Sequence, residues 1–212
     1  MKTLLILGYE DYARPFLKDY NVDITHAENF TGKVTDYHAV VFTGGADITP
    51  MLYNHKRHPN TSYDYRRDMI EAEIIKHCFN LKVPTIGICR GVQFQCVMNG
   101  GWLIQHIFHH RPFHAITTNK GETIQVNSLH HQLCVPVGYY HLLAWHDNYR
   151  MRVRYEGETE DSLPMDHNYR EPEALWYPNT RCLGVQYHPE RMDEESQGYK
   201  YFLNLVKEYI GC

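Results

Sequence analysis

The chain has 212 residues, of which 43% are hydrophobic and 22% are charged, and its formal net charge is −4. A chain of this length fits one compact domain, and we predict a single domain over residues 1–212. A net negative charge is unlike the broad basic face of proteins that bind nucleic acid, so we expect no nucleic-acid partner. No run approaches the roughly 18 consecutive apolar residues of a membrane helix, so we also expect no membrane partner.

The first half of the sequence alternates short apolar runs with amphipathic patterns. We predict buried strands at residues 3–7, 39–42 and 84–88, a short strand at 22–25, and helices at 12–19, 66–79 and 91–98. Strands that alternate with helices imply βαβ units and a mostly parallel sheet. Such sheets bind their ligands at the carboxyl ends of the strands. In this sequence Gly44 and Gly45 follow one predicted strand, and Cys89 follows the next.

The second half of the sequence has a different pattern, with short strand-like runs joined by turns. We predict that five runs extend the sheet with antiparallel strands: residues 114–118, 122–126, 140–145, 174–177 and 182–186. Arg150, Arg152 and Arg154 alternate with apolar residues, which predicts the solvent-facing side of a strand. Residues 156–170 are polar and irregular, which predicts a surface loop, and residues 196–210 have the amphipathic pattern of a final helix.

The N-terminal run and the cysteines both indicate a cytoplasmic protein. Residues 4–7 are apolar, but Glu10 and Asp11 follow at once and no small-residue cleavage site appears. We therefore interpret this run as a first strand and not as a signal peptide. The six cysteines form no Cys-x-x-Cys pair, and their spacing fits no zinc site. We expect reduced thiols, most of them packed as small hydrophobic side chains.

Cys89 lies between Gly87 and Gly91, after a predicted buried strand and before a predicted helix. A sharp strand-to-helix turn of this kind exposes the side chain at the edge of the sheet, and the glycines relieve the crowding. The N-terminus of the helix favours a thiolate, and its unpaired N–H groups can stabilise an oxyanion. The pattern predicts a nucleophilic thiol, although a buried cysteine in a tight turn gives the same pattern about as often.

His188 and Glu190 end a predicted strand, in the sequence His188-Pro189-Glu190. A thiol nucleophile needs a base, for which histidine is usual, and a carboxylate can hold the imidazole ring in place. Pro189 imposes an extended backbone on His188 and ends strand pairing, so Glu190 can turn back toward the ring. The alternatives are a surface histidine beside a solvated glutamate, and a different base at His130 or His131.

Together these motifs resemble a known family. Residues 87–93, Gly-Ile-Cys-Arg-Gly-Val-Gln, and the strand that ends in His-Pro-Glu are similar to those of the class I glutamine amidotransferase-like superfamily. The narrower resemblance is to the γ-glutamyl-γ-aminobutyrate hydrolase group, the C26-type cysteine peptidases. Four further segments support it: residues 42–53 with a glycine loop, 67–71 with an Arg-Asp pair, 100–106 with Gly-Gly-x-Leu, and 126–132 with Asn-Ser-x-His-x-Gln.

The resemblance implies a flavodoxin-like α/β fold, a three-layer sandwich around a mostly parallel sheet, without a metal or an organic cofactor. It implies a catalytic triad of Cys89, His188 and Glu190. It also implies an oxyanion hole made by the backbone N–H groups of Gly45 and Arg90. The substrate contacts that it implies are Gly44, Gln93, Ser128, Leu129 and His130.

The function that the resemblance implies is hydrolysis of a small-molecule γ-glutamyl amide through a thioester, which releases glutamate. A second interpretation is a glutaminase subunit that delivers ammonia to a synthetase partner. A third is a catalytically idle binding or regulatory module. Arg90 favours the hydrolase, because amidotransferase members more often carry another residue there. The sequence leaves open a homodimer and the identity of the leaving amine.

Two further patterns have alternative interpretations. His109, His110 and His114 are numerous enough for a metal site, but histidines are common in this part of the resembled group, so we expect no metal. Arg67 and Asp68 either pin the glycine loop or supply ordinary charge at a helix N-terminus.

Overall fold

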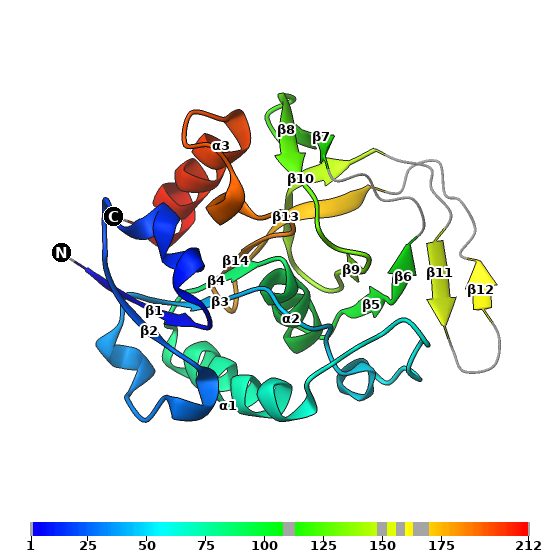
Figure 1. The fold of residues 1–212 in the computed structure, drawn as a ribbon, viewed down its shortest axis with the longest axis horizontal. Coiled ribbons are helices and arrows are strands. Elements are labelled where there is room, and N and C mark those ends of the chain that lie inside the picture. The colour runs from blue at the N-terminus through cyan, green and yellow to red at the C-terminus, as the bar shows by residue number, and fades with distance from the viewer. Residues whose placement is uncertain (1, 108–112, 148–151, 156–159, 163–169, 212) are drawn as a thin grey trace.

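A computed structural model of the chain describes residues 2–107, 113–147, 152–155, 160–162 and 170–211 (Figure 1). In these ranges the main sheet has nine strands, in the order β2-β1-β3-β4-β14-β13-β10-β7-β8. The first five strands in this order pair in parallel, as the alternation of strands and helices predicted. They are β2 (Asn21–Thr25), β1 (Thr3–Leu7), β3 (Ala39–Phe42), β4 (Thr85–Ile88) and β14 (Cys182–Val185).

The remaining four strands extend the sheet in antiparallel pairs, as predicted. They are β13 (Glu171–Tyr177), β10 (His141–His146), β7 (Phe113–Thr118) and β8 (Thr123–Asn127). The fifth run, β14, pairs antiparallel with β13 as predicted, but on its other side it runs parallel to β4, with Cys182 opposite Thr85 and Val185 opposite Ile88. All four residues of β14 are buried. A continuous buried run is typical of a central strand that is covered on both faces, as parallel strands are.

Helices cover both faces of the parallel part of the sheet (Figure 1). The helices α1 (Tyr65–Leu81) and α2 (Arg90–Met98) pack on one face, and α3 (Gln197–Val206) packs on the other. The predicted helix at residues 12–19 is instead the 3₁₀ helix η1 (Glu10–Phe16), which shares the face of α3. A short π-helix, η6 (Lys207–Gly211), continues α3.

Strand β1 shows how the sequence builds the three layers. Its side chains alternate between the two faces of the sheet. Leu4 and Ile6 belong to the hydrophobic cluster that includes Phe202 of α3, while Leu5 and Leu7 belong to the cluster formed with α1 and α2. These four side chains of β1 are almost fully buried. The predicted three-layer α/β sandwich is therefore confirmed.

Smaller elements surround this core. A three-stranded sheet consists of β6 (His106–Ile107), β11 (Arg152–Tyr155) and β12 (Glu160–Ser162), and β5 (Trp102–Ile104) pairs with β9 (Leu133–Val135). The predicted strand around Arg152 is present as β11, whereas Arg150 lies outside the described residues. The prediction of a loop at residues 156–170 is wrong for the part that forms β12, which pairs with β11. Strand pairing in a hairpin is made by the backbone, so a polar sequence gives little sign of it. The rest of that loop lies outside the described residues, apart from Arg170.

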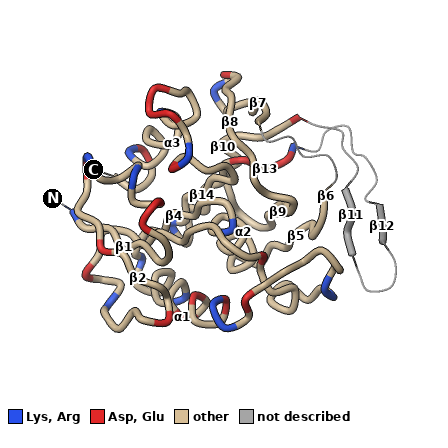
Figure 2. The backbone as a smooth tube through the Cα atoms, viewed as in Figure 1, with Lys and Arg blue, Asp and Glu red and all other residues tan. Residues whose placement is uncertain are grey.

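Charges of both signs are spread over the molecule, as Figure 2 shows for the backbone. Four short 3₁₀ helices connect the main elements: η2 (Ala27–Asn29), η3 (Val34–Asp36), η4 (Pro50–Tyr53) and η5 (Pro189–Arg191). In the described part of the chain, no helix combines the length and the apolar character needed to cross a membrane.

Candidate active site

Cys89 occupies the turn between β4 and α2, at the carboxyl edge of the parallel strands. Its backbone has a φ of 54° and a ψ of −107°, which residues other than glycine rarely adopt. The Cys89 N–H donates to the carbonyl oxygen of Val185 over 2.9 Å. A Cβ atom at Gly91 would lie 2.0 Å from the Phe42 carbonyl oxygen, so glycine is needed for α2 to begin this close to β3. The strained strand-to-helix turn expected from the sequence is present.

His188 and Glu190 follow β14, which is the neighbour of β4, so both residues reach the edge of the sheet where Cys89 lies. The Nδ1–H group of His188 donates to Glu190 Oε1 over 2.6 Å. His188 is 5% exposed and Glu190 is 4% exposed. The pair is therefore buried, unlike the surface histidine and solvated glutamate of the alternative interpretation.

The pKa of His188 depends on the residues that surround its ring. Burial lowers this pKa, but hydrogen bonds with Cys89 and Glu190, together with the charges of these two residues, outweigh burial and raise the pKa from 6.5 to about 9. At neutral pH the ring is therefore an imidazolium beside the sulfur of Cys89. A neighbouring imidazolium stabilises the thiolate form of a cysteine.

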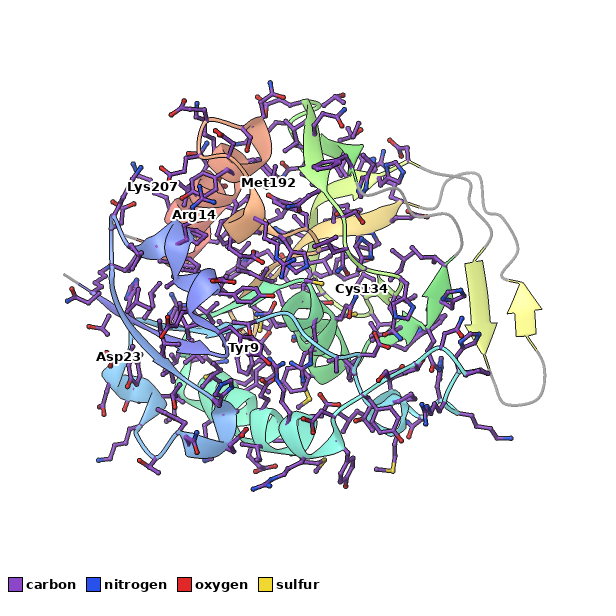
Figure 3. All side chains as sticks on the ribbon, viewed as in Figure 1. Tyr9, Arg14, Asp23, Cys134, Met192 and Lys207 are labelled. Atoms are coloured by element: carbon purple, nitrogen blue, oxygen red, sulfur yellow. The ribbon has the colours of Figure 1, made fainter. Side chains whose placement is uncertain are left out.

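Two residues without a predicted role hold the His188 segment in place. Asn127 Oδ1 accepts from the His188 N–H over 2.8 Å, and Asn127 Nδ2 donates to the His188 carbonyl over 2.9 Å. Arg14 donates to the carbonyl oxygens of Glu190 and Met192 over 3.1 and 3.0 Å, and Figure 3 shows Arg14 beside Met192. The two pairs are 61 and 176 positions apart in the sequence, so no local pattern indicates these contacts.

Tyr12 of η1 also lies against the site without a predicted role. The centroids of the Tyr12 and His188 rings are 6.3 Å apart, and the Tyr12 hydroxyl forms a hydrogen bond with the backbone of Gly44. Burial raises the pKa of Tyr12, and the charges of Glu190 and Cys89 raise it further. The phenol therefore stays protonated at neutral pH and closes the site on the side of η1.

Gly44 and Gly45 follow β3 and lie next to the start of α2. Gly45 has a φ of 147°, which favours glycine, and a Cβ atom there would lie 3.7 Å from Arg90 Cδ. Among the described residues, the N–H groups of Gly45 and Arg90 have no acceptor. Arg67 Nη1 donates to the Gly44 carbonyl over 3.1 Å, and Arg67 Nη2 donates to Thr43 Oγ1 over 3.2 Å. Of the two interpretations of Arg67, these contacts favour the one in which it pins the glycine loop.

A cavity of about 220 Å³ opens beside Cys89. Six residues that the sequence predicted for the site line it: Gly45, Cys89, Arg90, Gln93, Leu129 and His130. Gly44 and Ser128, two predicted substrate contacts, are not part of the lining. The remaining lining residues are Ala46, Asp47, Ser62, His131 and Gln132, of which Ser62 had no sequence signal. A larger hollow of about 500 Å³, between α1 and residues 27–35, contains no residue of the Cys89 site.

The polar side chains of the cavity are held by one another. Gln93 Nε2 donates to the Gln132 carbonyl over 3.3 Å and to Gln186 Oε1 over 3.1 Å, which fixes the amide at the cavity wall. Elsewhere in the lining, His131 Nε2 lies 3.1 Å from Asp47 Oδ1. The cavity therefore offers polar groups whose positions are set before any substrate binds.

His130, an alternative base, has other neighbours. Its Nδ1–H donates to the Gln132 carbonyl over 2.9 Å, and its Nε2 lies 3.9 Å from Glu173 Oε1. His114 Nε2 is 2.9 Å from the same Glu173 oxygen. Burial raises the pKa of Glu173, and the contact with His114 opposes that rise. These contacts direct His130 toward Glu173, whereas His188 forms a hydrogen bond with Cys89, which favours His188 as the base.

The proposed metal alternative involves His109 and His110, which lie outside the described residues. Within the described ranges, no three side chains of histidine, cysteine, aspartate or glutamate are grouped so that they could hold a metal ion.

Comparison with known proteins gives one family and several relatives. A family model described as Peptidase C26 matches residues 21–141, more than half of the chain. A putative glutamine amidotransferase from Mycobacterium tuberculosis is 29% identical over 196 residues, which are 82% of this chain and 57% of the relative. The chain thus spans little more than half the length of that protein. A gamma-glutamyl-CDP-amidate hydrolase from Campylobacter jejuni is 25% identical over 92% of this chain and 80% of its own length.

The fold is also similar to solved structures. A putative GMP synthase subunit from Thermoplasma acidophilum superposes with a TM-score of 0.66 at 14% identity, over 100% of this chain and 93% of that one. At this identity the likeness concerns the fold alone, and it agrees with the flavodoxin-like sandwich expected from the sequence.

Proposed function

The chain belongs to the peptidase C26 family, and from this membership we propose that it is a cysteine hydrolase of γ-glutamyl amides. The family and the relatives support a hydrolase that acts on carbon–nitrogen amide bonds. The observation that carries the narrower proposal is that His188, hydrogen-bonded to Glu190, is a close neighbour of Cys89, which borders a polar cavity. The reaction requires no metal or organic cofactor.

In the first half of the proposed reaction, the Cys89 thiolate adds to the γ-carbonyl carbon of the substrate. The carbonyl oxygen becomes an oxyanion that accepts hydrogen bonds from the N–H groups of Gly45 and Arg90. Loss of one donor of this kind typically costs about 10²–10³ in rate. The His188 imidazolium gives a proton to the leaving nitrogen, and the C–N bond breaks. The amine or ammonia departs, and a γ-glutamyl thioester remains on Cys89.

In the second half, water cleaves the thioester. His188, now neutral, takes a proton from the water as its oxygen adds to the carbonyl carbon. The C–S bond then breaks, glutamate leaves, and the thiolate of Cys89 and the imidazolium of His188 are restored. Glu190 keeps His188 Nδ1 protonated and the ring oriented throughout. The pKa of about 9 for His188 supports an imidazolium in the resting enzyme.

The cavity is the proposed site of the γ-glutamyl group. Gln93, Leu129 and His130 line it and are proposed to contact this group directly. Gly44 and Ser128 do not line it, so they are proposed to act through the backbone positions of their neighbours.

The test is a panel of γ-glutamyl amides, including glutamine, γ-glutamyl-γ-aminobutyrate and γ-glutamyl-p-nitroanilide, with glutamate release as the measurement. We expect the wild type to hydrolyse at least one, and Cys89→Ala to lose at least about 10⁴-fold in kcat. Treatment with 6-diazo-5-oxo-norleucine is expected to add one adduct, on Cys89. Full activity of Cys89→Ala contradicts the triad. An absence of both turnover and labelling of Cys89 supports the idle binding module instead.

A second candidate is a glutaminase subunit that delivers ammonia to a synthetase partner. It is favoured by the sequence similarity to the putative glutamine amidotransferase from Mycobacterium tuberculosis. Glutamine hydrolysis by the protein alone separates the two candidates, because a subunit of this kind is expected to need its partner. Turnover that appears only after addition of a synthetase supports the second candidate.

A further inference from the structure

Four charged side chains form a buried cluster beneath the glycine loop and outside the Cys89, His188 and Glu190 series. Arg67, Asp68 and Glu71 come from the first turns of α1, and Arg90 comes from the first residue of α2. Their side chains are between 0% and 16% exposed. Two cations and two anions balance, as buried charges require if they are to remain ionised.

Arg67 determines where one proposed oxyanion donor points. The carbonyl of Gly44 and the N–H of Gly45 belong to one trans peptide unit, which is rigid, and they point in opposite directions. The hydrogen bond from Arg67 Nη1 to the Gly44 carbonyl, 3.1 Å long, therefore also fixes the direction of the Gly45 N–H. Arg67 packs directly under this peptide, since a Cβ atom on Gly45 would lie 2.4 Å from Arg67 Nη1. Gly45 has a φ of 147°, and a glycine backbone is conformationally free. The hydrogen bond from Arg67 is therefore needed to hold this peptide in one orientation.

Arg90 supplies the other proposed donor, its own backbone N–H at the start of α2. Its side chain is anchored in the cluster. Arg90 Nη1 donates to Glu71 Oε2 over 2.6 Å, and Arg90 Nη2 pairs with Asp68. The other oxygen of Glu71, Oε1, accepts from Arg67 Nε over 2.7 Å. One carboxylate thus joins the residue that orients the Gly45 donor to the residue that carries the second donor.

We propose that Glu71 is a positioning residue that couples the two donors of the oxyanion hole, and this inference rests on the proposed function. Glu71 sets the separation of the guanidinium groups of Arg67 and Arg90, and thereby the separation of the Gly45 and Arg90 N–H groups. Asp68 has a different role, because its second oxygen accepts from the N–H and the hydroxyl of Thr49 and does not reach Arg67. Glu71 does not touch the substrate, so its effect reaches the reaction only through these two neighbours.

The test uses Glu71→Asp, which keeps the charge of the buried cluster but shortens the side chain by one methylene group. The shorter carboxylate can hold one arginine in place but not both. The matched control is Glu73→Asp, on the same helix, where the side chain is 64% exposed and pairs with Lys76. Each protein is assayed for kcat and KM on the γ-glutamyl amide that the wild type hydrolyses best, and for the rate at which iodoacetamide alkylates Cys89.

We expect kcat of Glu71→Asp to fall by about 10–10²-fold, less than the loss of a whole donor. KM is expected to stay within about threefold, because the oxyanion exists only after attack has begun. The alkylation rate is expected to stay within about twofold, because displacement of iodide forms no oxyanion. Affinity for glutamate γ-semialdehyde, which forms a tetrahedral adduct with the thiol, is expected to fall by the same factor as kcat. Glu73→Asp is expected to match the wild type in every measurement.

A second variant, Arg67→Lys, keeps the positive charge but offers no planar group that can bind Glu71 and the Gly44 carbonyl together. Its kcat is expected to fall by a similar factor, and the double variant is expected to fall little further, because both changes break one connection. Unchanged kcat in both single variants overturns the inference. An alkylation rate that falls in step with kcat also overturns it, since Glu71 would then act on the Cys89 turn. A wild type that cleaves no γ-glutamyl amide contradicts the proposed function, and with it this inference.

Discussion

Two regions of the described structure hold buried thiols, and in one of them the thiol borders a cavity and has a histidine as a neighbour. Cys89 lies at the carboxyl edge of the sheet, in the hydrophobic cluster shared with α3. Cys78, Cys96, Cys134 and Cys182 lie between the sheet and the layer of α1 and α2, and Cys134 is labelled there in Figure 3. All five are free thiols and none is more than 8% exposed. The degree of burial therefore does not distinguish the two regions.

The neighbours of each thiol distinguish them. Burial, with a smaller contribution from Cys182, raises the pKa of Cys78 to about 12, and burial also raises the pKa of Cys134 and of Cys182. Cys89 instead forms a hydrogen bond with His188, whose pKa is about 9, and it borders the 220 Å³ cavity. The comparison teaches that a base and an opening, and not depth in the fold, prepare a thiol for attack.

The strongest test of this distinction between the two regions is alkylation of the native protein with a limiting amount of iodoacetamide. We expect Cys89 to react at least about 100-fold faster than any cysteine of the α1 and α2 layer, since burial in apolar surroundings disfavours the thiolate and those thiols lack an opening. Cys212 lies outside the described residues, so it is replaced by serine in the protein tested. Peptide mass spectrometry after short exposure gives the rate for each site.

The internal control is the same protein in denaturant, in which all the remaining thiols are expected to react at similar rates. Native labelling of Cys134 or Cys182 as fast as that of Cys89 contradicts the distinction between the two regions.

The layers of the fold could be predicted from the sequence because their signals are local. The apolar run of β1 and the amphipathic pattern of α1 each indicate their element from adjacent residues. The placement of β14 was not predictable in this way, because its partner β4 is almost a hundred positions away and its pairing depends on the path of the chain. Residues 12–19 have the spacing of an α-helix, but the element ends at Phe16, just after Pro15, as a 3₁₀ helix.

The candidate site also has one part that could be predicted from the local sequence and one part that could not. The Cys89 turn and the His188–Glu190 pair are each contained in a few residues, and their sequence alone indicated a thiol, a base and a carboxylate. Asn127 and Arg14 act on His188 and Glu190 from distant segments, so their roles appear only in the folded chain. Long-range hydrogen bonds of this kind have no periodicity or spacing that a sequence can display.

A smaller effect concerns the titration of His188. Removal of the sulfur in Cys89→Ala deletes a hydrogen bond and a charge that both raise the pKa of His188, while burial, which lowers it, remains. We therefore expect the pKa to fall from about 9 in the wild type toward the ordinary value of 6.5. The measurement is a pH titration of the ring by NMR on histidine-labelled protein. Cys134→Ala serves as the control and is expected to leave the titration unchanged. A pKa that stays at about 9 in Cys89→Ala would assign the shift to Glu190 alone.

The smallest effect on activity is expected for Cys134→Ala. Cys134 is fully buried, so the loss of its sulfur removes packing and lowers the free energy of unfolding by roughly 1 kcal/mol. Its kcat is expected to stay within about twofold of the wild type, because Cys134 lies outside the cavity beside Cys89. Cys89→Ala is expected to show the reverse pattern, with turnover lost and a similar or smaller change in unfolding by urea. If Cys134→Ala instead lost activity while its stability was unchanged, the α1 and α2 layer would take part in the chemistry, and the two regions would not be separate.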